Sequence, residues 1–252
     1  MINWQEKFDR VYVIHYIPYK ERLEHLHSEL GRVGLLDSPI LRWNYTYDSP
    51  FYEMFYNNKN VPKEGRNPNF HLNAMKVALA HYSVMKEALS QPDVHRILIL
   101  ENDITFLKDL SLMERIIDEY PSFADIVLFD RVFIGKDLYD KYMESGKVTE
   151  HYYRYVFSVY LASCYSVSRK AMETITKSQE TFLHGPDMYT NLTKMFEQDE
   201  DSRSLHRMFS LPSLGIQKEF SQQASEHSKE GGNTVYNAPF VYSDINKDDY
   251  NL

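Results

Sequence analysis

Cysteine is almost absent from this chain, because Cys164 is the only one among 252 residues. A single cysteine cannot close an intrachain disulfide, and it cannot build a cysteine metal cluster. No apolar run approaches the roughly 18–20 residues that a helix needs to span a bilayer. Residues 1–7 also lack the charged and apolar regions of a signal peptide. These absences predict a cytoplasmic protein without a transmembrane segment.

Basic patches are also missing, and the formal net charge is −8. Proteins that bind nucleic acids need clustered positive charge against the phosphate backbone, so a nucleic-acid partner is not expected. No internal repeat and no second domain boundary is visible. We therefore expect one domain over residues 1–220 and a polar tail or lid over residues 221–252, packed on the same domain. Aromatic residues are abundant, with 20 Tyr and 14 Phe, and most should lie in the core.

Short apolar runs alternate with helical patterns along the chain, which predicts an α/β fold around a mostly parallel sheet. A final edge strand is expected over residues 209–217, because Pro212 excludes a central position. Residues 49–70 are predicted to form a long loop, and residues 131–156 a polar, aromatic segment. The predicted strands cover residues 11–15, 40–43, 97–100, 125–130 and 160–167, and the predicted helices cover residues 21–30, 72–89, 110–117 and 169–175.

The most informative stretch is residues 96–105, where an apolar run leads directly into Glu101, Asn102 and Asp103. An unbroken apolar run of this length indicates a strand buried on both faces. Ligands of open α/β sheets collect at the carboxyl ends of such strands. Carboxylates there can hold Mg²⁺ or Mn²⁺, and the ion can hold a diphosphate. The alternative is that Asp103 caps the next helix and Glu101 faces water.

The order of these motifs resembles glycosyltransferase family 25, the lipooligosaccharide-biosynthesis type with a GT-A-like fold. Residues 11–22 look like the family's opening strand and arginine-bearing helix start. Residues 97–103 resemble its apolar strand running into Glu-Asp-Asp, with Asn102 in place of the first Asp. Residues 163–172 are similar to its Ala-Tyr-x-x-Ser-Arg-x-x-Ala segment, and residues 185–187 fit its Pro-x-Asp segment loosely.

A closing segment with proline, glutamine and serine is matched by Pro212, Gln217 and Ser221, so the resemblance covers about residues 10–221. The chain departs from the family in the helix before the central strand. The family shows Glu-x-Gly-Cys-x-x-Ser-His there, whereas residues 74–81 keep only the histidine, His81.

The resemblance implies an inverting transfer of a sugar, galactose being favoured, from a UDP-sugar donor to a glycan or glycolipid precursor of lipooligosaccharide or lipopolysaccharide type. It implies Mn²⁺ or Mg²⁺ as the cofactor. Asp103 is expected to ligate the metal, and Glu101 to ligate it through water or to hold the donor's ribose. Peripheral contact with the inner face of the membrane is compatible with such an acceptor.

Other donor contacts are expected near the first strand and in the helix before the central strand. His15 and Tyr16 are predicted to frame the base, and Arg22 to contact the nucleotide. Lys76 is a candidate for a phosphate contact, with a surface lysine as the alternative. His81 is a candidate donor contact, and its alternative is a hydrogen-bonded histidine of the core.

An inverting transfer needs one general base on the acceptor hydroxyl. Asp187 is the first candidate and Asp130 the second. The alternative for Asp187 is a stabilising position in the first turn of a helix. The tail is predicted to close over the diphosphate, with His227 as an additional metal ligand. Its alternative is permanent packing of residues 240–242 on the sheet.

Two other function classes stay open. A noncatalytic nucleotide- or sugar-binding relative would keep the fold without turnover, and the departures at Asn102 and in residues 74–80 support that interpretation. A metal-dependent hydrolase would also place carboxylates at strand ends, but the sequence shows no further acidic or histidine ligands at recognisable spacing.

Overall fold

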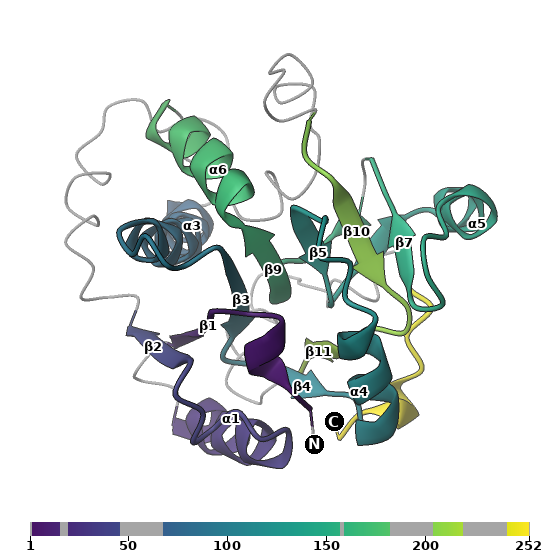
Figure 1. Ribbon diagram of the computed structural model, residues 1–252, viewed down its shortest axis with the longest axis horizontal. Coiled ribbons are helices and arrows are strands. Elements are labelled where there is room, and N and C mark those ends of the chain that lie inside the picture. The colour runs from purple at the N-terminus through teal and green to yellow at the C-terminus, as the bar shows by residue number, and fades with distance from the viewer. Residues whose placement is uncertain are drawn as a thin grey trace.

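A seven-stranded mixed sheet forms the centre of the computed structural model, which describes residues 2–15, 20–45, 68–156, 159–181, 204–218 and 241–251 (Figure 1). Its strands are β1 (Arg10–His15), β2 (Leu41–Tyr45), β3 (Arg96–Glu101), β5 (Ile126–Leu128), β7 (Tyr152–Arg154), β9 (Cys164–Ser168) and β10 (Arg207–Ser210). They lie in the order β2-β1-β3-β9-β5-β10-β7. Strands β9 and β7 run against the direction that the other strands share, so the predicted mostly parallel sheet is confirmed.

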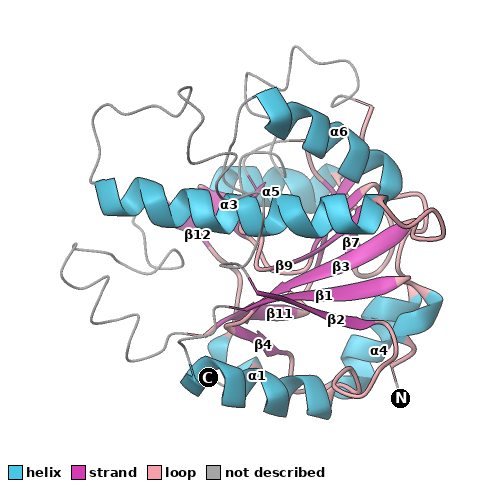
Figure 2. Cartoon of the chain, turned by 90° about the vertical axis from the view of Figure 1, so that its left-hand side faces the viewer, coloured by secondary structure: helices cyan, strands magenta, loops and turns pink. Residues whose placement is uncertain are grey.

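Helices cover both faces of this sheet (Figure 2). They are α1 (Lys20–Arg32), α3 (Pro68–Leu89), α4 (Leu110–Asp118), α5 (Lys136–Ser145) and α6 (Arg169–Thr181). Alternate residues of a strand point to opposite faces. Val11 and Val13 accordingly pack in the core that contains α1 and α4, whereas Tyr12 and Ile14 pack in the core that contains α3 and α6. The α/β class predicted from the apolar runs is therefore confirmed.

Two smaller sheets extend the central one. In the first, β4 (Ile104–Phe106) pairs with β11 (Gly215–Gln217), and because β4 directly follows β3, this pairing brings β11 beside the end of β3. In the second, β6 (Val132–Ile134) lies between β8 (Val159–Tyr160) and β12 (Val241–Tyr242). Short 3-10 helices cover Trp4–Glu6 and Lys247–Asp249.

The expected edge strand over residues 209–217 is wrong. Strand β10 ends at Ser210 and lies inside the sheet between β5 and β7, and β7 forms that edge. Pro212 follows the end of β10, so its missing N–H removes no ladder hydrogen bond from the strand. The chain then continues into β11, which belongs to a different sheet.

Two further segments differ from expectation. Residues 131–156, predicted as a polar and aromatic segment, contain β6, α5 and β7. The strand predicted over residues 160–167 is divided into β8 and β9, with Leu161 between them at a φ of 85°. A positive φ is strained for a branched side chain and interrupts an extended strand.

The described part of the tail, residues 241–251, packs on the domain. Strand β12 pairs with β6, and Tyr250, which is buried, bridges to Leu107. The predicted loop over residues 49–70 lies largely outside the described residues, as does the tail before residue 241. Among the helices of the described ranges, none combines the length and apolar character that crossing a bilayer requires.

Candidate functional site

The carboxyl ends of β1 and β3 bring the predicted acidic motif beside the first strand. These strands are parallel, and Ile14 lies opposite Glu101. His15 follows Ile14 and Asn102 follows Glu101, so these two residues lie side by side at the same edge of the sheet. His15, Asn102 and Asp103 are buried, and Glu101 is partly exposed. The structure thus places the motif where ligands of α/β sheets bind.

Asn102 is the centre of a polar network at this edge. Its side-chain amide donates to Nδ1 of His15 over 3.1 Å, and its Oδ1 accepts from Nη1 of Arg22 over 3.0 Å. The same Nη1 lies 3.5 Å from Oδ2 of Asp103. Asn102 therefore joins His15 to Arg22, and Arg22 extends the network to Asp103.

The charge state of His15 suits an asparagine at position 102. Burial lowers the pKa of His15, and the positive charge of Arg22 and the nearby His27 lower that pKa further. A neutral imidazole has one ring nitrogen that accepts a hydrogen bond, and the amide of Asn102 supplies the donor. An ionised aspartate has no donor, so Asn102 fits its neighbour better than the family's acidic residue would.

Glu101 is contacted by a buried histidine and by a partly exposed glutamine. Its Oε1 lies 3.0 Å from Nε2 of His81, and its Oε2 accepts from Nε2 of Gln217 over 3.3 Å. Nδ1 of His81 lies 2.8 Å from the hydroxyl of Tyr165. Because an ionised carboxylate only accepts, Nε2 of His81 donates to Glu101. His81 is fully buried, so in this structure it orients Glu101 as a hydrogen-bonded residue of the core.

Asp103 does not cap a helix. The helix that follows, α4, is capped by Asp109, whose Oδ1 accepts from the backbone N–H groups of Ser111 and Leu112. Asp103 instead sits in the turn between β3 and β4, where its carbonyl accepts from the backbone N–H of Lys218 over 2.7 Å. The helix-capping interpretation of Asp103 is therefore wrong, and its carboxylate faces Arg22.

Helix α1, which carries Arg22, is fixed against β4. The carboxylate of Glu29 accepts from the backbone N–H of Phe106 and from Nη2 of Arg32, both over 2.7 Å. One turn earlier, Nε2 of His25 lies 2.8 Å from Oγ1 of Thr105. These contacts fix the middle and the end of α1 against β4, which directly follows the Glu101–Asp103 segment.

Of the remaining predicted site residues, some lie within the described part of the structure and others do not. Asp130 is fully buried, and its Oδ2 accepts from Oγ of Ser163, whose carbonyl in turn accepts from the backbone N–H of Glu101 over 2.7 Å. Lys76 belongs to α3, but its side chain is outside the described part of the structure. Tyr16, Asp187 and His227 also lie outside the described residues.

Three residues of the site, Ser163, Tyr165 and Gln217, were not predicted as site residues. Gln217 reaches Glu101 only because β11 pairs with β4, and that pairing joins distant parts of the chain. Ser163 directly precedes β9 and Tyr165 belongs to it, and both lie near the site because β9 pairs antiparallel with β3. Their sequence signal is the family resemblance alone, because Ser163 and Tyr165 lie in residues 163–172 and Gln217 lies in the closing segment.

The donor atoms at this edge fit a hard divalent cation. Glu101 and Asp103 offer carboxylate oxygens two residues apart, and Asn102 between them carries an amide oxygen. Mg²⁺ and Mn²⁺ favour oxygen ligands of this kind. Arg22 already balances part of the charge of Asp103, so a metal ion and this guanidinium would share the carboxylate.

Comparisons with known protein families and with curated protein sequences find no significant match. A glycosyltransferase involved in the glycosylation of the major capsid of PBCV-1 is 8% identical, with 88% of this chain and 98% of that one covered and a TM-score of 0.45. A 4-diphosphocytidyl-2C-methyl-D-erythritolsynthase from Anaerococcus prevotii is 11% identical, with 89% and 98% covered and a TM-score of 0.42. Likenesses at these TM-scores carry no argument about activity, and membership of family 25 stays a prediction.

Proposed function

We propose that the chain is a metal-dependent glycosyltransferase that uses a nucleotide-sugar donor. One observation carries the proposal: His15, Arg22, Asn102 and Asp103 form one connected network at the carboxyl ends of two parallel strands, and Glu101 lies next to it in the chain. This is the position where α/β sheets bind nucleotides. The network and Glu101 together offer one guanidinium and two carboxylates, which suits a diphosphate held together with a cation.

Each residue of the network has a proposed role. Glu101 and Asp103 hold Mn²⁺ or Mg²⁺, and Arg22 contacts the nucleotide. A divalent ion bound there would stabilise the negative charge that develops on the departing nucleoside diphosphate. His15, together with Tyr16, frames the base. The proposed role of His81 is to hold Glu101 in place, since its ring is buried between Glu101 and Tyr165.

An inverting mechanism requires a base on the acceptor side. Asp187 is the proposed base, with Asp130 as the second candidate. The burial of Asp130 and its hydrogen bond with Ser163 favour Asp187, because a base must reach the acceptor hydroxyl. We also propose that the tail closes over the diphosphate of the donor and that His227 is an additional ligand of the metal.

Galactose as the sugar, UDP as the carrier and a lipooligosaccharide-type glycan as the acceptor rest on the resemblance to family 25. The second candidate function is a noncatalytic nucleotide- or sugar-binding protein. The ion pair between Arg22 and Asp103 favours this candidate, because it engages the carboxylate that a catalytic metal would need. The transferase function predicts nucleotide binding and turnover, whereas the second candidate predicts binding of a nucleotide or a sugar without turnover.

The test is to incubate the protein with UDP-galactose and measure UDP release in Mn²⁺ and in EDTA. We expect slow donor hydrolysis that depends on Mn²⁺, as water replaces the missing acceptor. Titration calorimetry with UDP in the same two buffers should show tighter binding with Mn²⁺. UDP binding without any release from a panel of UDP-sugars would favour the noncatalytic function, and an absence of UDP binding would contradict a transferase that uses a UDP-sugar.

Replacing Arg22 with alanine is expected to raise the donor KM by about tenfold and to change kcat little. The guanidinium is proposed to contact the nucleotide in the ground state and in the transition state alike, and loss of such uniform binding appears in KM. Steady-state kinetics over a range of donor concentrations measure the two constants. Arg115→Ala removes an exposed arginine from α4 and is the matched control. An unchanged donor KM in Arg22→Ala would contradict the assignment.

A further inference from the structure

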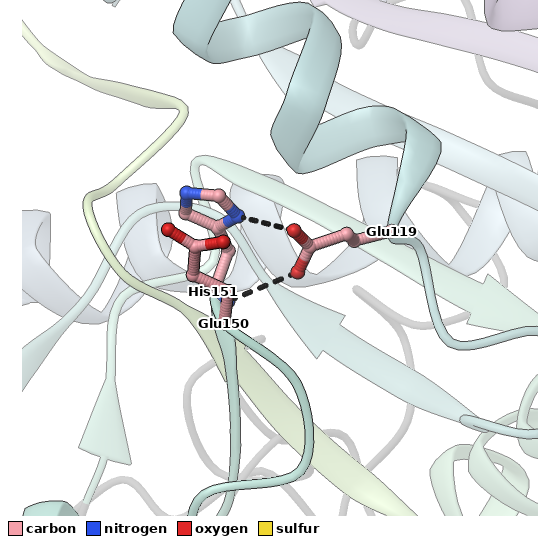
Figure 3. Close-up of side chains that lie close together, drawn as sticks. All are labelled: Glu119, Glu150 and His151. Carbon is pink, nitrogen blue, oxygen red and sulfur yellow. Dashed lines mark hydrogen bonds and ion pairs between the residues drawn. The ribbon is translucent and has the colours of Figure 1, made fainter.

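A second group of potential metal ligands lies beside the edge strand β7. Glu119 directly follows α4, and Glu150 and His151 directly precede β7. One ligand atom from each of these three residues lies within 4.8 Å of the others. Figure 3 shows the two carboxylates and the imidazole turned toward one another. None of the three contributes to the network around Asn102.

The backbone that carries Glu150 and His151 is held in place by several hydrogen bonds. Oγ1 of Thr149 accepts from the backbone N–H groups of His151 and Tyr152 over 3.3 and 3.2 Å. The carbonyl of His151 accepts from the backbone N–H of Leu211 over 2.8 Å. The backbone N–H of His151 also donates to Oε2 of Glu119 over 3.2 Å. These hydrogen bonds fix the backbone of His151 and join it to Glu119 before any ligand binds, and the side chain of Glu150 beside them is exposed.

The ring of His151 points into the group. Its side chain is only 7% exposed, and Nδ1 lies 3.0 Å from Oε1 of Glu119. Glu119 is therefore the partner of this nitrogen, in an ion pair when the imidazole is protonated, although the contact is not well aligned as a hydrogen bond. A buried imidazole nitrogen and a carboxylate oxygen that face one another at this distance are also arranged as two ligands of a shared cation would be.

We propose that Glu119, Glu150 and His151 bind a zinc ion. Imidazole nitrogen and carboxylate oxygen are both common zinc ligands, and sites with three protein ligands leave a fourth position for water. Two ionised carboxylates balance the charge of Zn²⁺. The imidazole favours zinc over Mg²⁺ or Ca²⁺, which prefer oxygen alone.

This site is separate from the Glu101–Asp103 segment. Strands β9, β5 and β10 lie between β3 and β7. At about 4.8 Å between neighbouring strands, β3 and β7 are roughly 19 Å apart. Zinc at the second site would tie the end of α4 to the edge strand of the sheet. The proposal does not depend on the proposed transferase function.

The experiment is a calorimetric titration of ZnCl₂ into full-length, tag-free protein that has been treated with EDTA and dialysed, with no nucleotide present. We expect one ion per chain to bind. His151→Gln and Glu150→Gln should each weaken that binding at least tenfold. Glu150 is exposed, so its variant should fold normally, which its melting curve in EDTA will check. The matched controls are His206→Gln and Glu144→Gln, which change exposed residues elsewhere and should bind as the wild type does.

Thermal unfolding gives a second measurement. A ligand at about a hundred times its Kd should raise the Tm of a chain of this size by about 5–10 °C, because it binds only the folded state. We expect this shift in the wild type and in Asp103→Asn, and its loss in Glu150→Gln. The proposal is overturned if the wild type binds no zinc, if Glu150→Gln and His151→Gln bind it as tightly as the wild type, or if only Asp103→Asn loses it.

Discussion

Replacing Asp103 with asparagine is expected to remove the strengthening of UDP binding by Mn²⁺ and to lower kcat/KM for the donor by at least about a hundredfold. The proposed metal site has two carboxylates, and this change removes the charge of the more buried one. A bound divalent ion contributes several kcal/mol to the stabilisation of developing charge, and each 1.36 kcal/mol of barrier is a factor of ten in rate.

The structure explains why the fold should survive this change. Asparagine has nearly the same shape as aspartate, and Arg22 keeps its 3.0 Å hydrogen bond to Asn102. The carbonyl of residue 103 still accepts from Lys218, so the turn into β4 is retained. Loss of metal-dependent binding with an unchanged Tm would therefore locate the effect in the carboxylate itself.

Calorimetry with UDP in Mn²⁺ and in EDTA is the measurement. The matched control is Asp93→Asn. Asp93 lies just before β3, is exposed and forms an ion pair with Arg10 of β1. We expect this control to bind UDP as the wild type does in both buffers. If Asp103→Asn still binds UDP more tightly in Mn²⁺, the metal is held elsewhere, and the role proposed for Asp103 is wrong.

The parts of the fold that the sequence predicts well are those determined by local pattern. The run from Ile97 to Leu100 is apolar at every position, and each of these residues is fully buried in β3. The position of Glu101 and Asp103 at the end of that strand follows from the pattern. The helical spacing of apolar residues likewise predicts α1, α4 and most of α3, because the face of a helix is set by neighbours in sequence.

Strand order and long-range contacts were not predictable in the same way. Strand β9 lies between β3 and β5 in the sheet, although β5 precedes β9 in sequence. No local sequence pattern predicts that a later strand inserts between two earlier ones. The predicted edge position of residues 209–217 is wrong because β10 ends at Ser210, before Pro212. The hydrogen bond between Gln217 and Glu101 depends on the pairing of β11 with β4, so the candidate site was predicted only in part.

Arg131 is another residue whose environment the sequence does not reveal, and its partner carries the second large expected effect. Replacing Asp244 with alanine is expected to lower the free energy of unfolding by about 3–5 kcal/mol, because it leaves a buried guanidinium without its counter-charge. Arg131 has no exposed surface, and its Nη2 contacts both oxygens of Asp244 over 2.9 and 3.1 Å.

The guanidinium also joins three parts of the chain. Its Nη1 donates to Oγ of Ser213, in the connection between β10 and β11. Its central carbon lies 5.1 Å from the ring centre of Phe209 and 5.5 Å from that of Phe133. Asp244 brings the carboxyl-terminal segment to this point, so the pair fixes residues 241–251 on the domain.

Urea denaturation of wild type, Asp244→Ala, Arg131→Met and the double variant measures the effect. The double variant should be more stable than Asp244→Ala. Methionine at position 131 removes the unpaired buried charge and fills part of the volume of the arginine side chain. Asp140→Ala is the control, since it breaks an exposed ion pair with Lys136 and should change the unfolding midpoint little. If the two single changes simply add in the double variant, Arg131 and Asp244 do not stabilise the fold as a pair.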